Sequence, residues 1–307
     1  MEFREFQYVI AIAKYQNITK AAESLYIGQP TLSKFLKNLE DELGVSLFRK
    51  AGHKYHLTYV GERYLEKAEQ ILQLKSDLDA ELADIVKRNV GVLRLGFPTM
   101  RCTYMLPAIL PAFQEMYPNV KIQIVEGPSA ELDKKLLNME VDLAFYNQRF
   151  GDTNPLIQTK ILGEEELLIC VKKGHPMERF AQPNPASKYP RLDVRLLQNE
   201  TILLMLKNQR TRQIIDQYLH QQGVVFENIL HTSNIPAIME LISVGYGVSF
   251  LFEPHILQHN FKNPISCFSF GEPRTTSALV VATRKNSYLP SFANDYIELA
   301  KRLYINI

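Results

Sequence analysis

The apolar positions of the first 58 residues recur at helical spacing. Phe3, Phe6 and Val9 lie three residues apart, which is typical of one buried face of a helix. A second, short helix is predicted to follow, with Thr19 as its N-cap, because a threonine hydroxyl can accept an orphan backbone N–H. Pro30 suits the first turn of a third helix, where its missing N–H costs little.

The third helix has two different faces. Its inner face carries Leu32, Phe35, Leu36 and Leu39. Its outer face carries Thr31, Ser33, Lys34, Lys37 and Asn38. No acidic residue occurs between Gly28 and Leu39. Two short helices joined by a turn, the second with a polar and basic outer face, indicate a helix-turn-helix. The glycine turn between Leu47 and Thr58 predicts a β-hairpin wing with basic residues at its tip. A generic three-helix packing module is the alternative.

A long helix is predicted over residues 59–88, where Gly61 is the last glycine and no proline interrupts. Apolar positions there follow steps of four and three, as in a heptad seam that is broken by Lys75. The seam consists of Tyr64, Ala68, Ile71, Lys75, Leu78, Leu82 and Ile85. A lone helix of this length with such a seam needs a partner. The partner is either a second copy or the C-terminal domain of the same chain.

The pattern changes at Gly91, where apolar strands begin to alternate with helices. Val120, Ile122 and Ile124 alternate as a strand, and Ser129 is expected to cap the next helix, Ala130–Met139. Such alternation predicts parallel sheets with crossover helices. The 219 residues from 89 to 307 are enough for two lobes.

Composition narrows the class of protein. The net charge of +2 excludes a polybasic protein, so any contact with nucleic acid must come from a local patch. The 46% of hydrophobic residues excludes intrinsic disorder. Cys102, Cys170 and Cys267 are scattered, which predicts reduced thiols rather than a disulfide framework. The charged N-terminus is unlike a signal peptide, and the apolar stretch Leu241–Phe252 is too short to span a membrane. We therefore expect a cytoplasmic protein.

Five segments of the first 61 residues keep a specific order and spacing. They are Phe6–Val9, Ile18–Leu25, Gln29–Lys34, Leu39–Phe48 and Leu57–Gly61. Together they closely resemble the N-terminal region of LysR-type transcriptional regulators. One departure is Gly28, where the family usually has a serine cap, but glycine is a tolerated N-cap.

The resemblance implies an α+β multidomain fold. An N-terminal winged helix-turn-helix domain (1–58) is followed by a dimerising linker helix (59–88), which pairs antiparallel with its copy. A C-terminal two-lobed α/β effector-binding domain of the periplasmic-binding-protein type covers 89–307. Lobe I is expected at about 91–161 and 268–307, and lobe II at about 162–267. Family members usually form homotetramers, so the expected partners are double-stranded promoter DNA, a small-molecule effector, further copies of the chain and RNA polymerase.

The third helix is expected to enter the major groove of DNA. Lysine can donate to guanine and glutamine can pair with adenine, while wing residues meet phosphates or the minor groove. The candidate DNA-binding residues are Gln29, Pro30, Thr31, Ser33, Lys34, Lys37, Arg49, His53 and Lys54.

Effector contacts are expected where strands end, since ligands of α/β sheets bind beyond the carboxyl ends of the strands. The resemblance places the effector pocket at the same loops. The candidates are Thr99, Met100, Arg101, Pro128, Ser129, Tyr146, Asn147, Arg149 and Leu204. Hydroxyls and helix N-termini there favour an anion, and Arg101 with Arg149 would clamp a small carboxylate. Alternatively, both arginines lie on the lobe surface.

Two other functions are weighed against an effector-controlled regulator. A ligand-independent architectural repressor of the same fold would have its pocket filled by Met100, Tyr146 and Phe250. An enzyme is disfavoured because no nucleophile–base constellation is present. The pairs His53/His56 and His255/His259 lack a third ligand nearby, so neither a metal nor a cofactor is expected.

Overall fold

The computed structural model describes residues 3–52, 54–85, 90–148, 151 and 154–304. The chain divides into two compact units, Met1–Val86 and Lys87–Ile307, which are described separately below. Within the described residues, no helix combines the length and the apolar character needed to cross a membrane.

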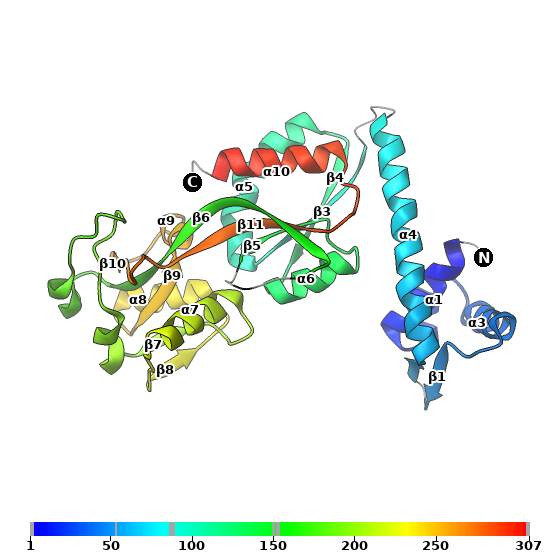
Figure 1. Ribbon diagram of the computed structural model, residues 1–307, viewed down its shortest axis with the longest axis horizontal. Coiled ribbons are helices and arrows are strands. Elements are labelled where there is room, and N and C mark those ends of the chain that lie inside the picture. Colours follow the sequence, from blue (N-terminus) through cyan, green and yellow to red (C-terminus); the bar gives the residue numbers. More distant parts are fainter. Residues whose placement is uncertain (1–2, 53, 86–89, 149–150, 152–153, 305–307) are drawn as a thin grey trace. The chain divides into compact units, whose positions relative to one another are not determined.

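The described residues of the N-terminal unit form four helices and a two-stranded hairpin (Figure 1). The helices are α1 (Phe3–Tyr15), α2 (Ile18–Ser24), α3 (Gln29–Leu43) and α4 (Tyr59–Ile85), and the strands are β1 (Phe48–Ala51) and β2 (Lys54–Leu57). Val9, Ile12, Leu32 and Leu47 form the centre of its core and are fully buried. The helix-turn-helix and the wing predicted from the apolar spacing are therefore confirmed.

The predicted cap of α2 is wrong. Asn17, not Thr19, is the N-cap, and its Oδ1 accepts from the backbone N–H groups of Thr19 and Lys20 at 3.0 and 3.1 Å. Asparagine is at least as good a cap as threonine. The helix therefore starts at the first position that can cap it and includes Ile18 in its buried face.

Gly61 brings the first turn of α4 against the wing. A Cβ at this position would lie 2.0 Å from the carbonyl oxygen of Leu47. That carbonyl is held in place, because it accepts from the N–H of Thr58 at 2.9 Å and from its hydroxyl at 3.2 Å. Only glycine allows this approach of helix to hairpin.

We therefore expect Gly61→Ala to lower the free energy of unfolding of the N-terminal unit by about 1–3 kcal/mol, as overpacking usually does. This sign is opposite to the gain of roughly 1 kcal/mol that alanine brings over glycine in an open helix. Urea denaturation of the full-length protein measures the effect. Ser76→Ala, at an exposed position of the same helix, is the control and should be neutral or slightly stabilising. A midpoint for Gly61→Ala at or above that of the wild type would contradict the expectation.

The C-terminal unit contains a long mixed sheet divided between two lobes. Its strands are β3 (Gly91–Phe97), β4 (Val120–Glu126), β5 (Leu143–Asn147), β6 (Ile157–Lys172), β7 (Ile202–Leu204), β8 (Ile229–His231), β9 (Val248–Phe252), β10 (Ile265–Phe268) and β11 (Thr276–Arg284). Their order is β4-β3-β5-β11-β6-β9-β7-β8, with β10 paired to β6. β3, β4 and β5 are parallel in lobe I, and β7, β8 and β9 are parallel in lobe II.

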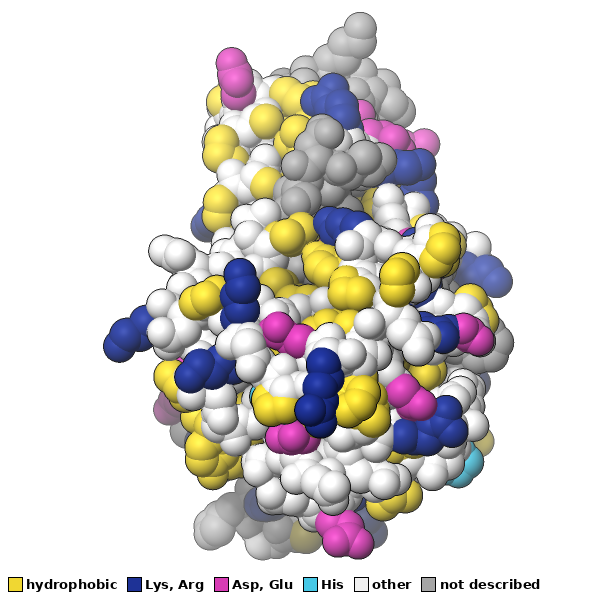
Figure 2. Space-filling model, turned by 90° about the vertical axis from the view of Figure 1, so that its left-hand side faces the viewer, with side chains coloured by type: hydrophobic (Ala, Val, Ile, Leu, Met, Phe, Trp, Pro, Cys, Tyr) yellow, Lys and Arg dark blue, Asp and Glu magenta, His cyan; other side chains and the backbone are white. Residues whose placement is uncertain are grey.

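Helices flank both groups of parallel strands. They are α5 (Thr99–Met116), α6 (Ser129–Leu137) and α10 (Ser291–Tyr304) in lobe I, and α7 (Arg210–Gln221), α8 (Ile235–Val244) and α9 (Glu253–Leu257) in lobe II. Two short 3-10 helices, Pro176–Phe180 and Val194–Asn199, lie in the proline-rich loop of lobe II. Figure 2 shows an outer face on which Lys and Arg side chains are interspersed with acidic and apolar ones.

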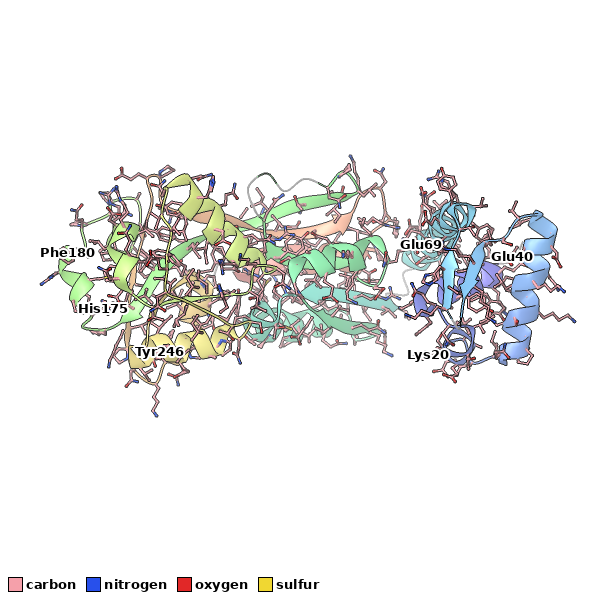
Figure 3. The ribbon with its side chains drawn as sticks, turned by 90° about the horizontal axis from the view of Figure 1, so that it is seen from below. Lys20, Glu40, Glu69, His175, Phe180 and Tyr246 are labelled. Atoms are coloured by element: carbon pink, nitrogen blue, oxygen red, sulfur yellow. The ribbon has the colours of Figure 1, made fainter. Side chains whose placement is uncertain are left out.

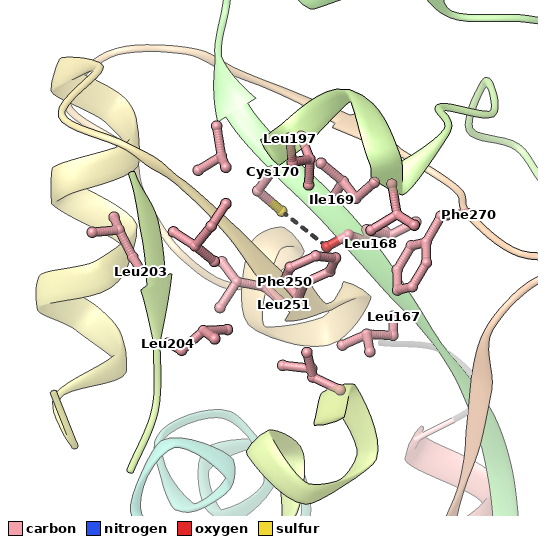
Figure 4. Packing of buried hydrophobic residues seen from close by; sticks show 14 of the residues in the cluster. Leu167, Leu168, Ile169, Cys170, Leu197, Leu203, Leu204, Phe250, Leu251 and Phe270 are labelled. Atoms are coloured by element: carbon pink, nitrogen blue, oxygen red, sulfur yellow. Dashed lines mark hydrogen bonds between the residues drawn. The ribbon is translucent and has the colours of Figure 1, made fainter. Parts of the chain in front are cut away.

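The two lobes are joined by β6 and by the chain that leads into β11 (Figure 1). β6 pairs with β11 as far as Glu166 and with β9 from Leu167 onward. Each lobe has its own apolar core, and Figure 4 shows part of the lobe II core around Phe250 and Leu251. The two-lobed α/β arrangement is confirmed.

Two local expectations need correction. Parallel sheets were expected, but β6 starts at Ile157 and pairs antiparallel with β11, so the sheets are mixed rather than purely parallel. Ser129 is the first residue of α6 and not its cap; Pro128 occupies the cap position, and no side chain caps the helix.

Candidate functional site

The outer face of α3 is the first candidate site. Gly28 begins the helix as its N-cap, and Gly44 ends it in the left-handed conformation. Leu32, Leu36 and Leu39 are buried and fix which face points outward. Gln29, Pro30, Thr31, Lys34 and Lys37 are exposed, whereas Ser33 is half-buried. An exposed helix face of this kind has the dimensions that fit the major groove.

The wing is hydrogen-bonded to α3. Glu40 Oε1 accepts from the backbone N–H groups of Leu47 and Phe48 at 2.6 and 2.9 Å, and Figure 3 shows Glu40 between α3 and the hairpin. Arg49 and Lys54 are exposed on the two wing strands. His53, the third wing candidate, lies outside the described residues.

The predicted seam of α4 splits into two parts. Ala68 is buried, and the ring of Tyr64 lies 6.1 Å from that of Phe6 on α1, so this part packs inside its own unit. Further along the helix, four apolar residues have exposed fractions between 37% and 70%, far above the exposed fractions of the core residues. They are Ile71, Leu74, Leu78 and Leu82. Lys75 lies among them and pairs with Asp79, whereas the Ile85 side chain lies outside the described part of the helix.

The second candidate site is a cavity of about 490 Å³ in the C-terminal unit. The parallel strands of both lobes end at it, and four helices begin there. Lobe I contributes Pro98, Thr99, Met100, Arg101, Thr103, Gly127, Pro128, Ser129 and Asn147. Lobe II contributes Met205, Gln209, Arg210, Thr211, Ser233, Asn234, Ile235, Pro236 and His255. The cavity therefore lies between the lobes, within the size range of small-molecule sites.

The helix N-termini contribute partial positive charges to the cavity, in addition to any charged side chain. α5, α6 and α7 have no side-chain cap, so their first N–H groups remain available to a ligand. Helix N-termini favour anions because the peptide dipoles and free N–H groups point toward them. α8 differs, because Asn234 Oδ1 accepts from the N–H of Ala237 at 3.0 Å and Pro236 has no N–H.

Arg101 does not occupy the role that the sequence predicts for it. Its side chain is 2% exposed, and both of its terminal nitrogens donate to Glu165 at 2.8 Å, while Nη2 also donates to Asn147 Oδ1 at 2.6 Å. Burial would lower the pKa of Arg101, but Glu165 raises it above its usual value. Burial would raise the pKa of Glu165, but Arg101 and Asn147 hold it below its usual value. The guanidinium is a buried structural cation, neither a free clamp nor a surface group.

The sequence pattern missed Glu165 because it lies in the middle of β6 and not in a loop after a strand. Arg149, the other half of the expected clamp, lies outside the described residues. Because Arg101 is already paired with Glu165, it cannot form the expected two-arginine clamp on a ligand. It does contribute to the cavity wall.

Two other expected contacts lie away from the cavity. Leu204 is buried in the lobe II core (Figure 4), and its neighbour Met205 lines the cavity instead. Tyr146 lies beneath Arg210, whose Cζ is 4.7 Å from the ring centroid, and its hydroxyl donates to Asp133. Phe250, expected as a pocket-filling side chain, is also a core residue. Thr99, Met100, Pro128, Ser129 and Asn147 do line the cavity.

Arg210 links the two lobes at the cavity. It lies at the start of α7 in lobe II and pairs with Asp133 of α6 in lobe I at 2.9 Å. Its side chain is 11% exposed. The sequence signal for this residue, and for the other lobe II contacts, is that each lies at or near a helix start after β7, β8 or β9, as Thr99 and Ser129 do in lobe I.

His255 is the third titratable side chain in the cavity wall. It is 4% exposed, and its Nδ1 is buried without a hydrogen-bond partner. Its ring lies 6.0 Å from that of Tyr104. Burial, and then the positive charge of Arg101, lower the pKa of His255 to about 4, although Glu165 acts in the opposite direction. The imidazole is therefore uncharged at neutral pH.

The described residues contain no group of three or more histidines, cysteines or acids placed to hold a metal ion. His259, the other member of the histidine pair, instead lies 2.9 Å from Glu240.

Comparison with known proteins covers nearly the whole chain. Residues 3–62 match the family described as "Bacterial regulatory helix-turn-helix protein, lysR family", and residues 87–304 match "LysR substrate binding domain". The HTH-type transcriptional regulator YcgK of Bacillus subtilis is 29% identical, over 98% of this chain and 94% of its own. A full-length OxyR variant from Pseudomonas aeruginosa superposes with a TM-score of 0.75 at 25% identity, over 99% and 95% of the two chains. Full-length BenM has the same fold, with a TM-score of 0.59 at 23% identity, over 100% and 97%.

Proposed function

Since the chain belongs to the LysR family of DNA-binding transcriptional regulators, we propose that α3 and the wing recognise promoter DNA and that the cavity binds a small anionic effector that modulates this recognition. The DNA-contacting residues in this proposal are Gln29, Pro30, Thr31, Ser33, Lys34, Lys37, Arg49, His53 and Lys54. The observation that carries the first part is the exposed face of α3, which has polar and basic side chains and no acid between Gly28 and Leu39.

The oligomeric state is also part of the proposal. The exposed apolar residues Ile71, Leu74, Leu78 and Leu82 are proposed to pack against the same helix of a second copy. A dimer places two copies of α3 on one inverted-repeat site, and two dimers form the tetramer. The tetramer would act on transcription in the cytoplasm, in contact with RNA polymerase.

The open cavity favours a ligand-controlled regulator over a ligand-independent architectural one. Of the three side chains expected to fill it, only Met100 is in its wall. Uncapped helix N-termini and the hydroxyls of Thr99 and Ser129 support a small carboxylate as the effector. The proposed output is a change in DNA binding and not a chemical reaction.

Lys34→Ala tests the DNA-binding part. A lysine that donates to a base edge contributes about 1–3 kcal/mol of discrimination, so we expect the variant to bind roughly 5- to 150-fold more weakly at each half-site. The measurement is footprinting on a duplex selected by the wild-type protein from random sequences. Lys67→Ala, which removes the same charge from α4, is the control and should keep the wild-type footprint.

An unchanged footprint for Lys34→Ala would remove this residue from the recognition surface. A loss that is equal on selected and random DNA would assign Lys34 to phosphate contact instead of base reading.

A further inference from the structure

Two of the three cysteines lie opposite each other in the sheet of lobe II. Cys170 on β6 is the register partner of Cys267 on β10, and their Sγ atoms are 3.9 Å apart. Both are free thiols in the structure. They are 97 positions apart along the chain, so folding alone brings them together. The third cysteine, Cys102, belongs to the core of lobe I and is not part of this pair.

The backbone geometry at this pair suits a covalent link between the strands. Opposite residues of antiparallel strands alternate between hydrogen-bonded and non-hydrogen-bonded pairs, and the Cα atoms of the second kind are about 4.5 Å apart. The N–H of Lys173 donates to the carbonyl of Pro264, which makes those two residues a hydrogen-bonded pair. Three steps along the ladder, Cys170 and Cys267 therefore form a non-hydrogen-bonded pair. Disulfides span Cα separations of about 4.4–6.8 Å, so rotation of the two side chains can join the sulfurs without moving the strands.

The two thiols differ in accessibility. Cys170 is fully buried, and its Sγ lies 3.7 Å from the carbonyl oxygen of Leu168 (Figure 4). Burial, and then the hydrogen bond with Cys267, raise the pKa of Cys170 well above its usual value, so this thiol stays protonated at neutral pH. Cys267 is only half-buried. A dissolved oxidant therefore meets Cys267 first, and Cys170 is placed behind it to react second.

We propose that Cys170 and Cys267 are an oxidant-sensitive dithiol, which a small hydroperoxide converts to a cross-strand disulfide. The Sγ of Cys267 attacks one oxygen of hydrogen peroxide, the O–O bond breaks, and the leaving hydroxide takes the thiol proton to give a sulfenic acid and water. The Sγ of Cys170 then attacks the sulfur of Cys267, the S–O bond breaks, and the hydroxide leaves with the second thiol proton as water. Two thiols and one peroxide thus give one disulfide and two waters, and exchange with an added dithiol reverses the change.

The disulfide would constrain lobe II. It would tie β10 to β6, the strand that runs through both lobes, and would close a loop that contains β7, β8 and β9. A disulfide that closes a loop of this length should raise the midpoint of thermal unfolding of the C-terminal unit by about 4–15 °C. Neither cysteine is among the residues described as lining the effector cavity, so the inference does not depend on the proposed effector.

The test is treatment of the reduced full-length protein with a molar excess of hydrogen peroxide, followed by denaturation, alkylation of the remaining thiols and digestion. We expect Cys170 and Cys267 to lose alkylation together and to appear in one linked peptide pair, which dithiothreitol separates. Cys102 should remain alkylated, because burial raises its pKa to about 11. The midpoint of thermal unfolding should rise on oxidation and return to its starting value after dithiothreitol.

Single variants test the order of the two steps. In Cys170→Ala, the thiol of Cys267 should stop at the sulfenic acid, which dimedone traps. In Cys267→Ser, the thiol of Cys170 should stay reduced under the same treatment. Cys102→Ser is the matched control and should form the disulfide as the wild type does. If Cys170→Ala does not unfold cooperatively, the linked peptides of the wild-type protein still decide whether the bond forms.

Four results would overturn the inference. They are full alkylation of all three thiols after peroxide, oxidation of Cys102 ahead of Cys267, a disulfide between two copies of the chain in place of the internal one, and oxidation of Cys267 in the wild type without loss of the Cys170 thiol. The last of these would mean that Cys170 cannot reach its partner. Because each result is read from the thiols themselves, none of them changes the expectations for DNA recognition or effector binding.

Discussion

Replacing Arg101 with alanine is expected to lower the free energy of unfolding of the C-terminal unit by about 3–5 kcal/mol, the usual effect of leaving one member of a buried ion pair unpaired. Glu165 is as deeply buried as Arg101 and would lose both of its hydrogen bonds from the guanidinium. Asn147 would lose the donor to its Oδ1 as well. Urea denaturation of the full-length protein measures the change.

Two further variants serve as controls for this prediction. Arg94→Ala breaks a partly exposed pair with Asp142 and should cost less than about 1 kcal/mol. The double variant Arg101→Met, Glu165→Met removes both buried charges and should recover much of the lost stability, because apolar replacement of a whole buried pair is often neutral. If Arg101→Ala were no less stable than Arg94→Ala, the buried pair would not stabilise the C-terminal unit.

Acidification from pH 6.5 to 4.5 is expected to destabilise the C-terminal unit by about 2–3 kcal/mol through His255. The pKa of His255 is about 4 in the folded protein and about 6.5 in the unfolded chain. Between these values the unfolded chain binds a proton that the folded protein does not. The stability contributed by the neutral histidine is therefore complete above pH 6.5 and is lost progressively as the pH falls toward 4.

Glu165 acts in the same direction but in a lower range. Its pKa is held below the ordinary value of 4.5, so its contribution is complete above pH 4.5 and is lost as the pH falls below that. The loss of stability between pH 6.5 and 4.5 is therefore not due to Glu165. Burial raises the pKa of Asp142, which acts in the opposite direction, so the comparison with a His255 variant is what isolates His255. Urea midpoints across this range should fall less steeply in His255→Phe than in wild type or His259→Phe. Equal slopes in all three proteins would mean that His255 is not held neutral by burial.

The N-terminal unit was predictable from local pattern because its helices are short-range structures. The spacing of Leu32, Leu36 and Leu39 identified the buried face of α3 and, by exclusion, the exposed face with Lys34 and Lys37. The N-cap of α2 was predicted two residues too late. Several adjacent side chains can cap this helix, and the position at which the helix starts is known only from the folded structure.

The effector cavity was predictable only in part. Thr99 and Ser129 follow their strands directly, so the rule that ligands bind beyond strand ends located them. Leu204 and Tyr146 also lie near strand ends. The side chain of Leu204 nevertheless lies in the lobe II core, and that of Tyr146 packs against Arg210 of the other lobe. Alternation along a strand does not say which neighbour a side chain meets across a sheet.

The sequence by itself determined the family, the two-unit organisation and the surface of α3, because these depend on spacings within a few tens of residues. Tertiary structure alone decided that Arg101 is a buried partner of Glu165, 64 residues away, and that the charges of both act on His255. The physical reason is that a charge is stabilised by whatever lies within a few ångströms of it, and those neighbours come from distant parts of the chain. Whether an arginine binds a ligand or holds two lobes together depends on the acid that folding places beside it.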